Sequence, residues 1–134
     1  MNSHSEASRF QNAEDVYRAS MRWGEWDNAF QLMKERPDSI TKLKPPSEEY
    51  STHLGTIKIK EIEVLSSGMN ADLGTGQSKF KINYRFENSA VIKNIRHTIV
   101  WWYFKEANIW LTDTPLPKEF DLPKVKTIKL SPKK

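Results

Sequence analysis

Apolar residues in the first quarter of the chain repeat at the spacing of an α-helix. They recur every three or four residues and so share one helical face: Phe10, Ala13, Val16 and Tyr17. Gly24 interrupts this pattern, and Asp27 precedes a second apolar run that ends before Pro37. The spacing therefore predicts two helices within residues 8–35, with a bend at Gly24 and with Asp27 capping the second helix.

After residue 55 the apolar positions change to the period of two that is typical of a strand. In the run 56–65, the two apolar residues before Lys60 occupy odd positions, and those after Glu61 occupy even positions. One extra residue near Lys60–Glu61 would return all of them to one face, which is the signature of a β-bulge. Because bulges bend strands, the pattern predicts a curved sheet.

The rest of the chain alternates strands with turns. Residues 79–86 alternate clearly, with Phe80, Ile82, Tyr84 and Phe86 inward, and the longest strand is expected at roughly 91–105. The other expected elements are a loop with one helical turn (37–55), a polar glycine loop (66–77), a turn (87–90), a hairpin (105–108), a short strand (109–113) and an edge strand or flexible end (125–130).

Helices followed by antiparallel strands predict an α+β fold, with the helices packed on one face of a curved antiparallel sheet. With 134 residues the chain has the size of a single domain, 1–134. Residues 1–9 and roughly 118–134 are expected to be flexible ends.

Two stretches resemble a known family. One is YRASMRWGEWDNAFQLM (17–33), with a Trp-Gly-x-aromatic-Asp corner, and the other is RHTIVWWYFKEANIWLTDTPLP (96–117). Over roughly residues 10–120, the chain is similar to uncharacterised bacterial lipoproteins with a nuclear-transport-factor-2-like (cystatin-like) fold, a cone of helices against a curved sheet. The resemblance implies a location in the cell envelope, and dimers are frequent in that superfamily. It does not settle the activity, because the superfamily contains isomerases, dehydratases, cyclases and many non-enzymes.

The net charge of +4 belongs to one end of the chain. Six of the 21 Lys and Arg residues lie in 118–134, where only Glu119 and Asp121 are acidic, so residues 1–117 carry no net charge. Nucleic-acid binding calls for a clustered basic face on the domain, and none is expected here. A lysine-rich end is usually solvated, and docking on anionic lipid is the alternative.

The sequence predicts neither a membrane-spanning segment nor a disulfide bond. No run approaches the roughly 18 apolar residues of a membrane span, and no cysteine is present to form disulfides or accept a lipid. The polar start MNSHSEASRF is not a signal peptide. It is also what a removed signal or lipid-anchor segment would leave, so an envelope lipoprotein is preferred to a cytoplasmic protein, and membrane contact is expected only through such an anchor.

His97 is the best candidate for a catalytic residue. It shares the apolar face of its strand, so a partly desolvated imidazole near Asp15 or Tyr17 could act as a general base. The alternative is a histidine hydrogen-bonded in the core. The same face predicts a pocket for a small, mostly apolar ligand, lined by Tyr17, Trp26, Phe30, His97, Trp101 and Tyr103.

Other chemical motifs are weaker. His4, His53 and His97 lie too far apart to build a metal site locally, so no metal or cofactor is expected. The Gly-x-Gly of residues 73–77 precedes no helix and indicates a turn. The acidic pairs Glu14–Asp15 and Glu48–Glu49 are typical of solvated helix faces.

The other face of the long strand predicts an interface. It turns apolar at Val100, Trp102 and Phe104, and an exposed patch of that size is unusual on a monomer. A homodimer through the outer sheet face, with Trp102 as its anchor, is the preferred cover. The chain from 114 onward, or another protein or ligand, are the alternatives.

The sequence therefore predicts a non-enzymatic binding or assembly module. The alternative is an isomerase, dehydratase or hydrolase that needs no cofactor and uses His97 as its general base. An enzyme requires an open cavity with a carboxylate or phenol within hydrogen-bond reach of His97, whereas a binding module allows aromatic side chains to fill that space.

Overall fold

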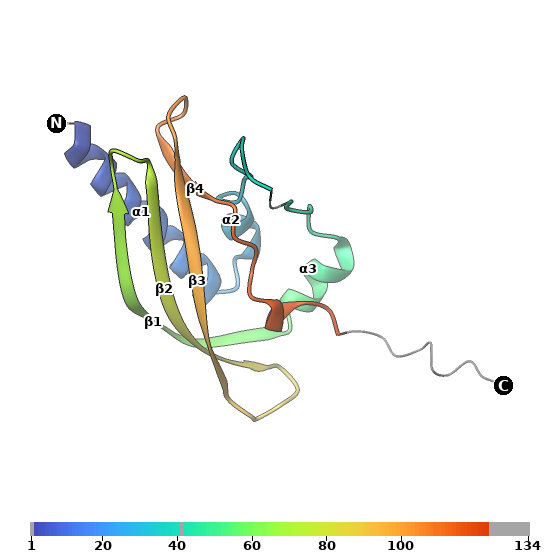
Figure 1. The fold of residues 1–134 in the computed structure, drawn as a ribbon. Helices are drawn as coiled ribbons and strands as arrows, with labels where there is room; N and C mark the ends of the chain where they lie inside the picture. Colours follow the sequence, from blue (N-terminus) through green and yellow to red (C-terminus); the bar gives the residue numbers. More distant parts are fainter. Residues whose placement is uncertain (1, 41, 124–134) are drawn as a thin grey trace.

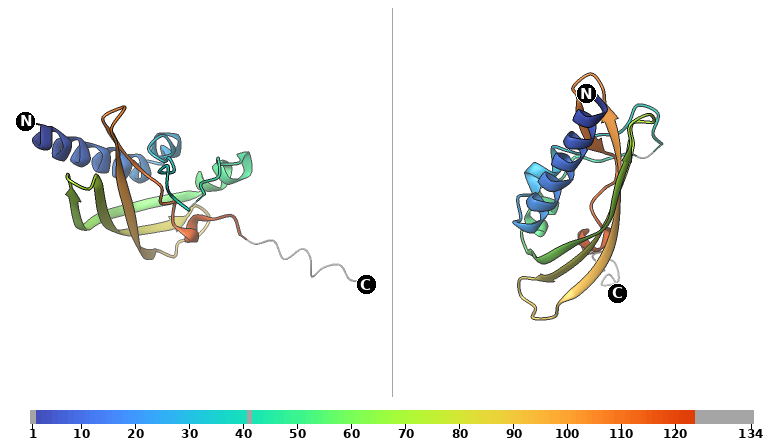
Figure 2. Two further views of the ribbon diagram at one scale, coloured as in Figure 1. Left: turned by 45° about the horizontal axis from the view of Figure 1, so that its top comes forward. Right: turned by 90° about the vertical axis from the view of Figure 1, so that its left-hand side faces the viewer.

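The computed structural model describes residues 2–40 and 42–123. Within them the chain is an α+β protein with three helices and an open, curved, antiparallel sheet of four strands in the order β1-β2-β3-β4. The elements in chain order are α1 (Asn2–Arg22), α2 (Trp26–Phe30), α3 (Glu48–Leu54), β1 (Ile57–Asn70), β2 (Thr75–Phe86), β3 (Lys93–Phe104), β4 (Ile109–Thr112) and the 3₁₀ turn η1 (Lys118–Phe120). The sheet curves around α1 (Figures 1 and 2).

The bend between the first two helices lies where the sequence predicts it. Gly24 has a φ of +72°, a left-handed conformation that glycine adopts without steric cost. The prediction that Asp27 caps α2 is wrong: Glu25 holds the N-cap position without a side-chain cap, and Asp27 lies in the first turn. The Glu25 N–H donates a hydrogen bond to the carbonyl of Ser20 (2.7 Å), which places the N-cap two residues earlier than a cap at Asp27 requires.

The register of β1 against β2 confirms the predicted bulge. The pairing shifts by one residue between Ile59 and Glu61, and a second shift, which the sequence does not predict, lies between Val64 and Ser66. An extra residue in one strand of an antiparallel pair bends that strand and increases its twist. The two shifts lie in the strand that curves around α1.

The polar glycine loop predicted at 66–77 is wrong. Its first part continues β1 to Asn70, its last part begins β2 at Thr75, and only residues 71–74 form the turn. Gly74, with a φ of +63°, supplies the left-handed residue that such a tight turn needs. The sequence does not reveal this end of β1, because its small polar residues give no alternation between apolar and polar positions.

The core lies between α1 and the concave face of the sheet. Its aromatic rings meet edge to face: Phe10 lies 6.1 Å from Trp101 and 5.2 Å from Trp110, and Tyr17 lies 5.7 Å from Trp101 between ring centroids. Such pairs contribute about 1 kcal/mol beyond their buried area. The four inward residues predicted for 79–86 face this core, three of them buried and Phe86 partly so.

Gly76 gives Phe10 the space for this packing. A Cβ atom at Gly76 would lie 2.6 Å from Cε1 of Phe10, whereas one at Gly68 would meet no heavy atom within 4 Å. We expect Gly76→Ala to lower the free energy of unfolding by about 2 kcal/mol, because the buried ring must move. Gly68→Ala, the matched control on the paired strand, should change it by less than about 0.5 kcal/mol. Urea denaturation measures both, and equal losses would contradict this account.

The edge of the sheet at β4 is joined by the segment that follows α2. Met33 forms a parallel bridge to Thr112. The Thr112 N–H donates to the Leu32 carbonyl (2.8 Å), and the Lys34 N–H donates to the Thr112 carbonyl (2.9 Å). Residues 32–34 thus extend the sheet, although the sequence predicts helix there, because their backbone groups pair with a strand almost 80 positions later.

Two segments predicted as flexible ends carry regular structure. Residues 2–9 begin α1, and the Trp110 indole N–H donates to the Glu6 carbonyl (3.0 Å). Residues 118–120 form η1, and Phe120 is fully buried against Trp26 and Tyr84. The strand considered for 125–130 lies outside the described residues. No helix in the described part of the chain is long and apolar enough to span a membrane.

Candidate functional site

The structure buries His97 without giving it a catalytic partner. The residue is 8% exposed, and its Nε2 atom has no hydrogen bond among the described residues. Burial lowers its pKa to about 4, against a smaller opposing effect of the Glu119 carboxylate. A general base works best with a pKa near the working pH, so this imidazole is a poor one at neutral pH.

Of the two partners considered for His97, Asp15 is hydrogen-bonded to other residues and Tyr17 is buried. Asp15 accepts hydrogen bonds from Arg18 (2.8 Å) and Gln11 (3.1 Å). The Tyr17 hydroxyl is buried and, among the described residues, has no hydrogen-bond partner. Its burial, with a smaller contribution from Tyr50, raises its pKa far above the ordinary value. Neither group forms a hydrogen bond to His97.

The space predicted as a pocket on the apolar face of β3 is filled by the side chains expected to line it. Tyr17 and Trp101 are completely buried, Trp26 packs edge to face on Phe120, and Tyr103 packs on Trp110 at 5.1 Å. Of the six residues predicted to line it, only Phe30 lines the open groove described below. The others, His97 included, build the core and its rim.

Trp102 is not an exposed anchor on the outer sheet face, contrary to the prediction. Its side chain is 5% exposed, and its indole N–H donates to the Lys34 carbonyl (2.9 Å). Residues 32–34, which pair with β4, contact this indole through the Lys34 carbonyl, and they belong to none of the three predicted covers. Val100 stays exposed and Phe104 partly so, and the homodimer through this face stays a prediction.

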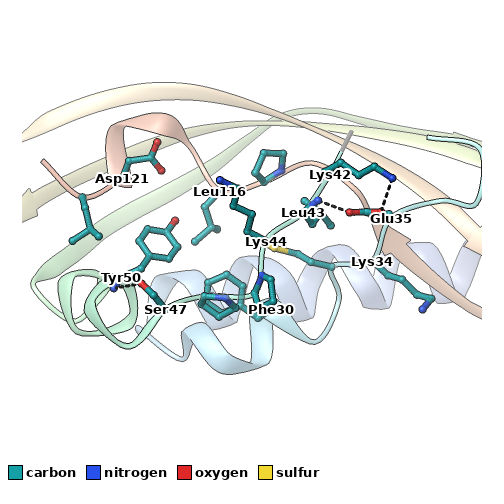
Figure 3. A pocket seen from close by; sticks show the side chains of 15 residues that line it. Phe30, Lys34, Glu35, Lys42, Leu43, Lys44, Ser47, Tyr50, Leu116 and Asp121 are labelled. Carbon is teal, nitrogen blue, oxygen red and sulfur yellow. Dashed lines mark hydrogen bonds and ion pairs between the residues drawn. The ribbon is translucent and has the colours of Figure 1, made fainter. Parts of the chain in front are cut away.

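An open groove lies between α2, α3 and the segment after β4. Its volume is about 970 Å³, at the upper end of the range of small-molecule sites. Apolar and aromatic side chains form most of its wall: Phe30, Met33, Leu43, Pro45, Pro46, Tyr50, Pro115, Leu116 and Leu122. In Figure 3, the side chains of Tyr50, Leu116 and Asp121 point into a common space.

Lysine residues supply the polar rim of this groove. Lys42 lies 4.0 Å from Glu35, whose carboxylate also accepts a hydrogen bond from the Leu43 N–H (2.5 Å). Lys44 extends across the groove, and Lys34 points away from the other labelled residues (Figure 3). Glu35 thus holds residues 42–43 in place. These residues belong to the part of the groove wall that contains Lys42 and Lys44.

Tyr50 lines the groove from α3, on the side where Asp121 also lines it. Its helix α3, predicted as one turn, begins at the N-cap Ser47, whose hydroxyl accepts the Tyr50 N–H (3.0 Å). Partial burial, and secondarily the Asp121 carboxylate, raise the pKa of the Tyr50 hydroxyl to about 12. The hydroxyl therefore stays protonated at neutral pH and can donate a hydrogen bond to a ligand.

A buried polar cluster lies between α1 and the sheet, and the sequence does not predict it. Glu14 is 1% exposed and accepts a hydrogen bond from the Ser78 hydroxyl. The Trp101 indole N–H donates to the same hydroxyl oxygen (2.9 Å). The solvated helix face expected for Glu14–Asp15 is thus wrong for Glu14, because it faces the core side of α1. The cluster satisfies buried polar groups and is closed to ligands.

The remaining motifs give no site in the described residues. No group of three or more histidines and carboxylates there could hold a metal ion. Of the Gly-x-Gly at residues 74–76, Gly74 lies in the β1–β2 turn as predicted, whereas Thr75 and Gly76 begin β2.

Comparison of the chain with protein-family models, with curated proteins and with solved structures found no match.

Proposed function

We propose that the protein is a non-enzymatic binding module whose ligand lies in the groove between α2, α3 and residues 115–122. The observation that carries this proposal is the groove itself, an open volume of about 970 Å³ with a largely apolar wall and a rim of lysines. Binding sites for small molecules commonly combine an apolar wall with a few polar groups. The ligand class that fits is a small, mostly apolar molecule.

Binding is preferred to catalysis because of the chemistry near the groove. The Tyr50 hydroxyl is protonated at neutral pH, and His97 is buried away from the groove wall. A general acid–base reaction needs a group of suitable pKa beside an open cavity. The groove offers hydrogen-bond donors and charges for holding a ligand instead.

We also propose that the fold is the nuclear-transport-factor-2-like cone of the bacterial lipoproteins that the sequence resembles. Support comes from the helix-first order and from the sheet that curves around α1. Association into a homodimer belongs to the same proposal, with Val100 and Phe104 as the residues of the outer face that stay accessible.

Substituting Leu122 tests the groove. Leu122 lines it and is already exposed, so Leu122→Asp should fold normally. We expect this variant to weaken binding of anilinonaphthalene sulfonate, an apolar probe with one negative charge, by about tenfold, because the new carboxylate repels the probe and replaces apolar wall. Fluorescence titration measures the dissociation constant.

The matched control is Leu73→Asp, which places the same charge on an exposed leucine in the β1–β2 turn. It should leave the dissociation constant within about twofold of the wild type, since it lies outside the groove. Equal weakening by the two variants, or none by either, would remove the groove as the binding site.

A further inference from the structure

The hairpin between β2 and β3 presents apolar side chains to solvent at its tip. Val91 and Ile92 are 62% and 51% exposed, and Ala90 before them is exposed as well. The hairpin projects from the end of the sheet opposite the β1–β2 turn (Figure 1). Two adjacent β-branched side chains are thus exposed in the hairpin loop, and neither lines the groove.

The tip is held in this shape by the backbone around it. Nη1 of Arg85 donates hydrogen bonds to the carbonyls of Phe86 (3.2 Å), Glu87 (3.1 Å) and Ser89 (3.3 Å). The Val91 N–H donates to the Ser89 hydroxyl oxygen (3.1 Å). A guanidinium that joins three carbonyls fixes the turn, so the exposure of the apolar pair belongs to the folded domain.

Positive charges on both faces of the sheet follow the apolar tip. Lys93 follows Ile92 and pairs in register with Tyr84 of the inner face, whereas Arg96 on the outer face pairs with Lys81. The described residues form no ion pair with these three cations. Glu87, the acid within the hairpin, lies 4.0 Å from the ammonium of Lys58, so it adds little negative charge at the tip.

The other acids of the outer sheet face are Glu61 and Glu63 on β1, two strands away from Arg96. Glu63 pairs in register with Lys81, and Glu61 accepts a hydrogen bond from Asn83 (3.4 Å). An apolar tip backed by cations matches the surface of an anionic bilayer, where apolar groups enter the headgroup region and cations meet lipid phosphates.

We propose that the β2–β3 hairpin docks this domain on an anionic lipid surface. Val91 and Ile92 enter the headgroup region, and Lys93 contacts lipid phosphates. Arg96 lies about 13 Å along the strand from Ile92 and acts within the range of charge attraction. This contact uses the folded domain itself, unlike the lipid anchor that the sequence resemblance implies.

A bilayer fits the hairpin tip better than a protein partner does. A stable protein interface buries roughly 800 Å² on each partner, which one short turn cannot supply. Peripheral membrane binding needs only shallow insertion of a few apolar groups together with charge attraction. Its strength should therefore fall as the salt concentration rises.

The test is flotation of the full chain with vesicles made of equal parts of phosphatidylcholine and phosphatidylglycerol. We expect the wild type to float with these vesicles at low salt and not with pure phosphatidylcholine. Val91→Ser combined with Ile92→Ser should lower the partition coefficient about tenfold without changing the net charge. Lys93→Gln combined with Arg96→Gln should weaken binding and flatten its salt dependence.

Leu73→Ser, at the exposed turn on the opposite end of the sheet, is the matched control and should float like the wild type. All variants keep residues 118–134, so the lysine-rich end contributes equally to each. Wild-type floating by the Val91/Ile92 variant would assign the binding to that end and overturn the proposal. So would a wild type that does not float, or one whose self-association the hairpin variant abolishes, since the occupant would then be a second copy.

Discussion

Replacing Glu14 by alanine is expected to lower the free energy of unfolding by about 3 kcal/mol. The substitution leaves the buried Ser78 hydroxyl without its acceptor, which costs about 1–3 kcal/mol, and removes packed methylene groups at about 0.8 kcal/mol each. Glu14→Gln keeps one acceptor oxygen and most of the volume, so its loss should be smaller, about 1 kcal/mol. Urea denaturation with a common slope measures the series.

Asp15 provides the control for this prediction within the same acidic pair. Its carboxylate is partly exposed and bonded to Arg18, so Asp15→Ala should cost less than about 1 kcal/mol. A double-mutant cycle with Ser78→Ala should show the double variant losing less than the sum of the single losses. Similar losses for Glu14→Ala and Asp15→Ala would show that the buried hydrogen bond contributes nothing.

Lowering the pH from about 6.5 to about 4 should destabilise the protein through His97 by up to about 3 kcal/mol. Burial lowers the pKa of His97 to about 4 in the folded chain, from the ordinary value of 6.5. Between these values the unfolded chain binds the proton that the folded chain excludes, so the free energy of unfolding falls with the pH. Above about 6.5 both states are neutral at His97, and below about 4 both are protonated, so no further change arises there.

The contribution of His97 is isolated by comparing two pH profiles. The wild type and His97→Leu share every other titrating group, so the difference between their unfolding free energies should change between pH 6.5 and 4 and stay flat above that range. Guanidinium denaturation at several pH values in this window gives the two profiles. Parallel profiles would mean that the imidazole is protonated in place when the protein is folded.

The sequence predicts those parts of the fold that follow from neighbouring residues. The change of parity across Lys60–Glu61 predicts the bulge because apolar side chains must return to one face of a half-buried strand. The small residues at 66–70 lack such a pattern, and there the strand cannot be distinguished from a loop. Gly24 predicts the bend between the helices because the left-handed backbone conformation of a bend favours glycine at that position.

The errors on individual side chains come from contacts between distant residues. Trp102 is covered because its indole bonds to a carbonyl 68 residues away, and Glu14 is buried because its partner Ser78 lies 64 residues away. No local pattern encodes either contact. A glutamate next to an aspartate on a helix looks the same in sequence whether it faces water or a serine on the sheet.

Sequence patterns do not predict the candidate groove either, because segments distant in the chain form it. Its wall includes residues 42–47, a stretch whose prolines and lysines resemble an ordinary loop. Only the pairing of residues 32–34 with β4, and the burial of Phe120 after it, bring this loop opposite residues 115–122. The aromatic residues chosen for the predicted pocket are large enough to fill the space between helix and sheet themselves.

The two irregularities of β1 have a consequence for how copies of this domain behave when crowded together. β1 is an edge strand, and a regular edge of this length is a template on which another chain can add a strand and begin a fibril. The register shifts after Ile59 and Val64 interrupt the row of outward-facing amides. Arg22 also donates a hydrogen bond to the Ile59 carbonyl (2.9 Å), and charged side chains alternate along the same stretch. The bend that lets the sheet enclose α1 therefore also protects the protein from polymerising through its open side.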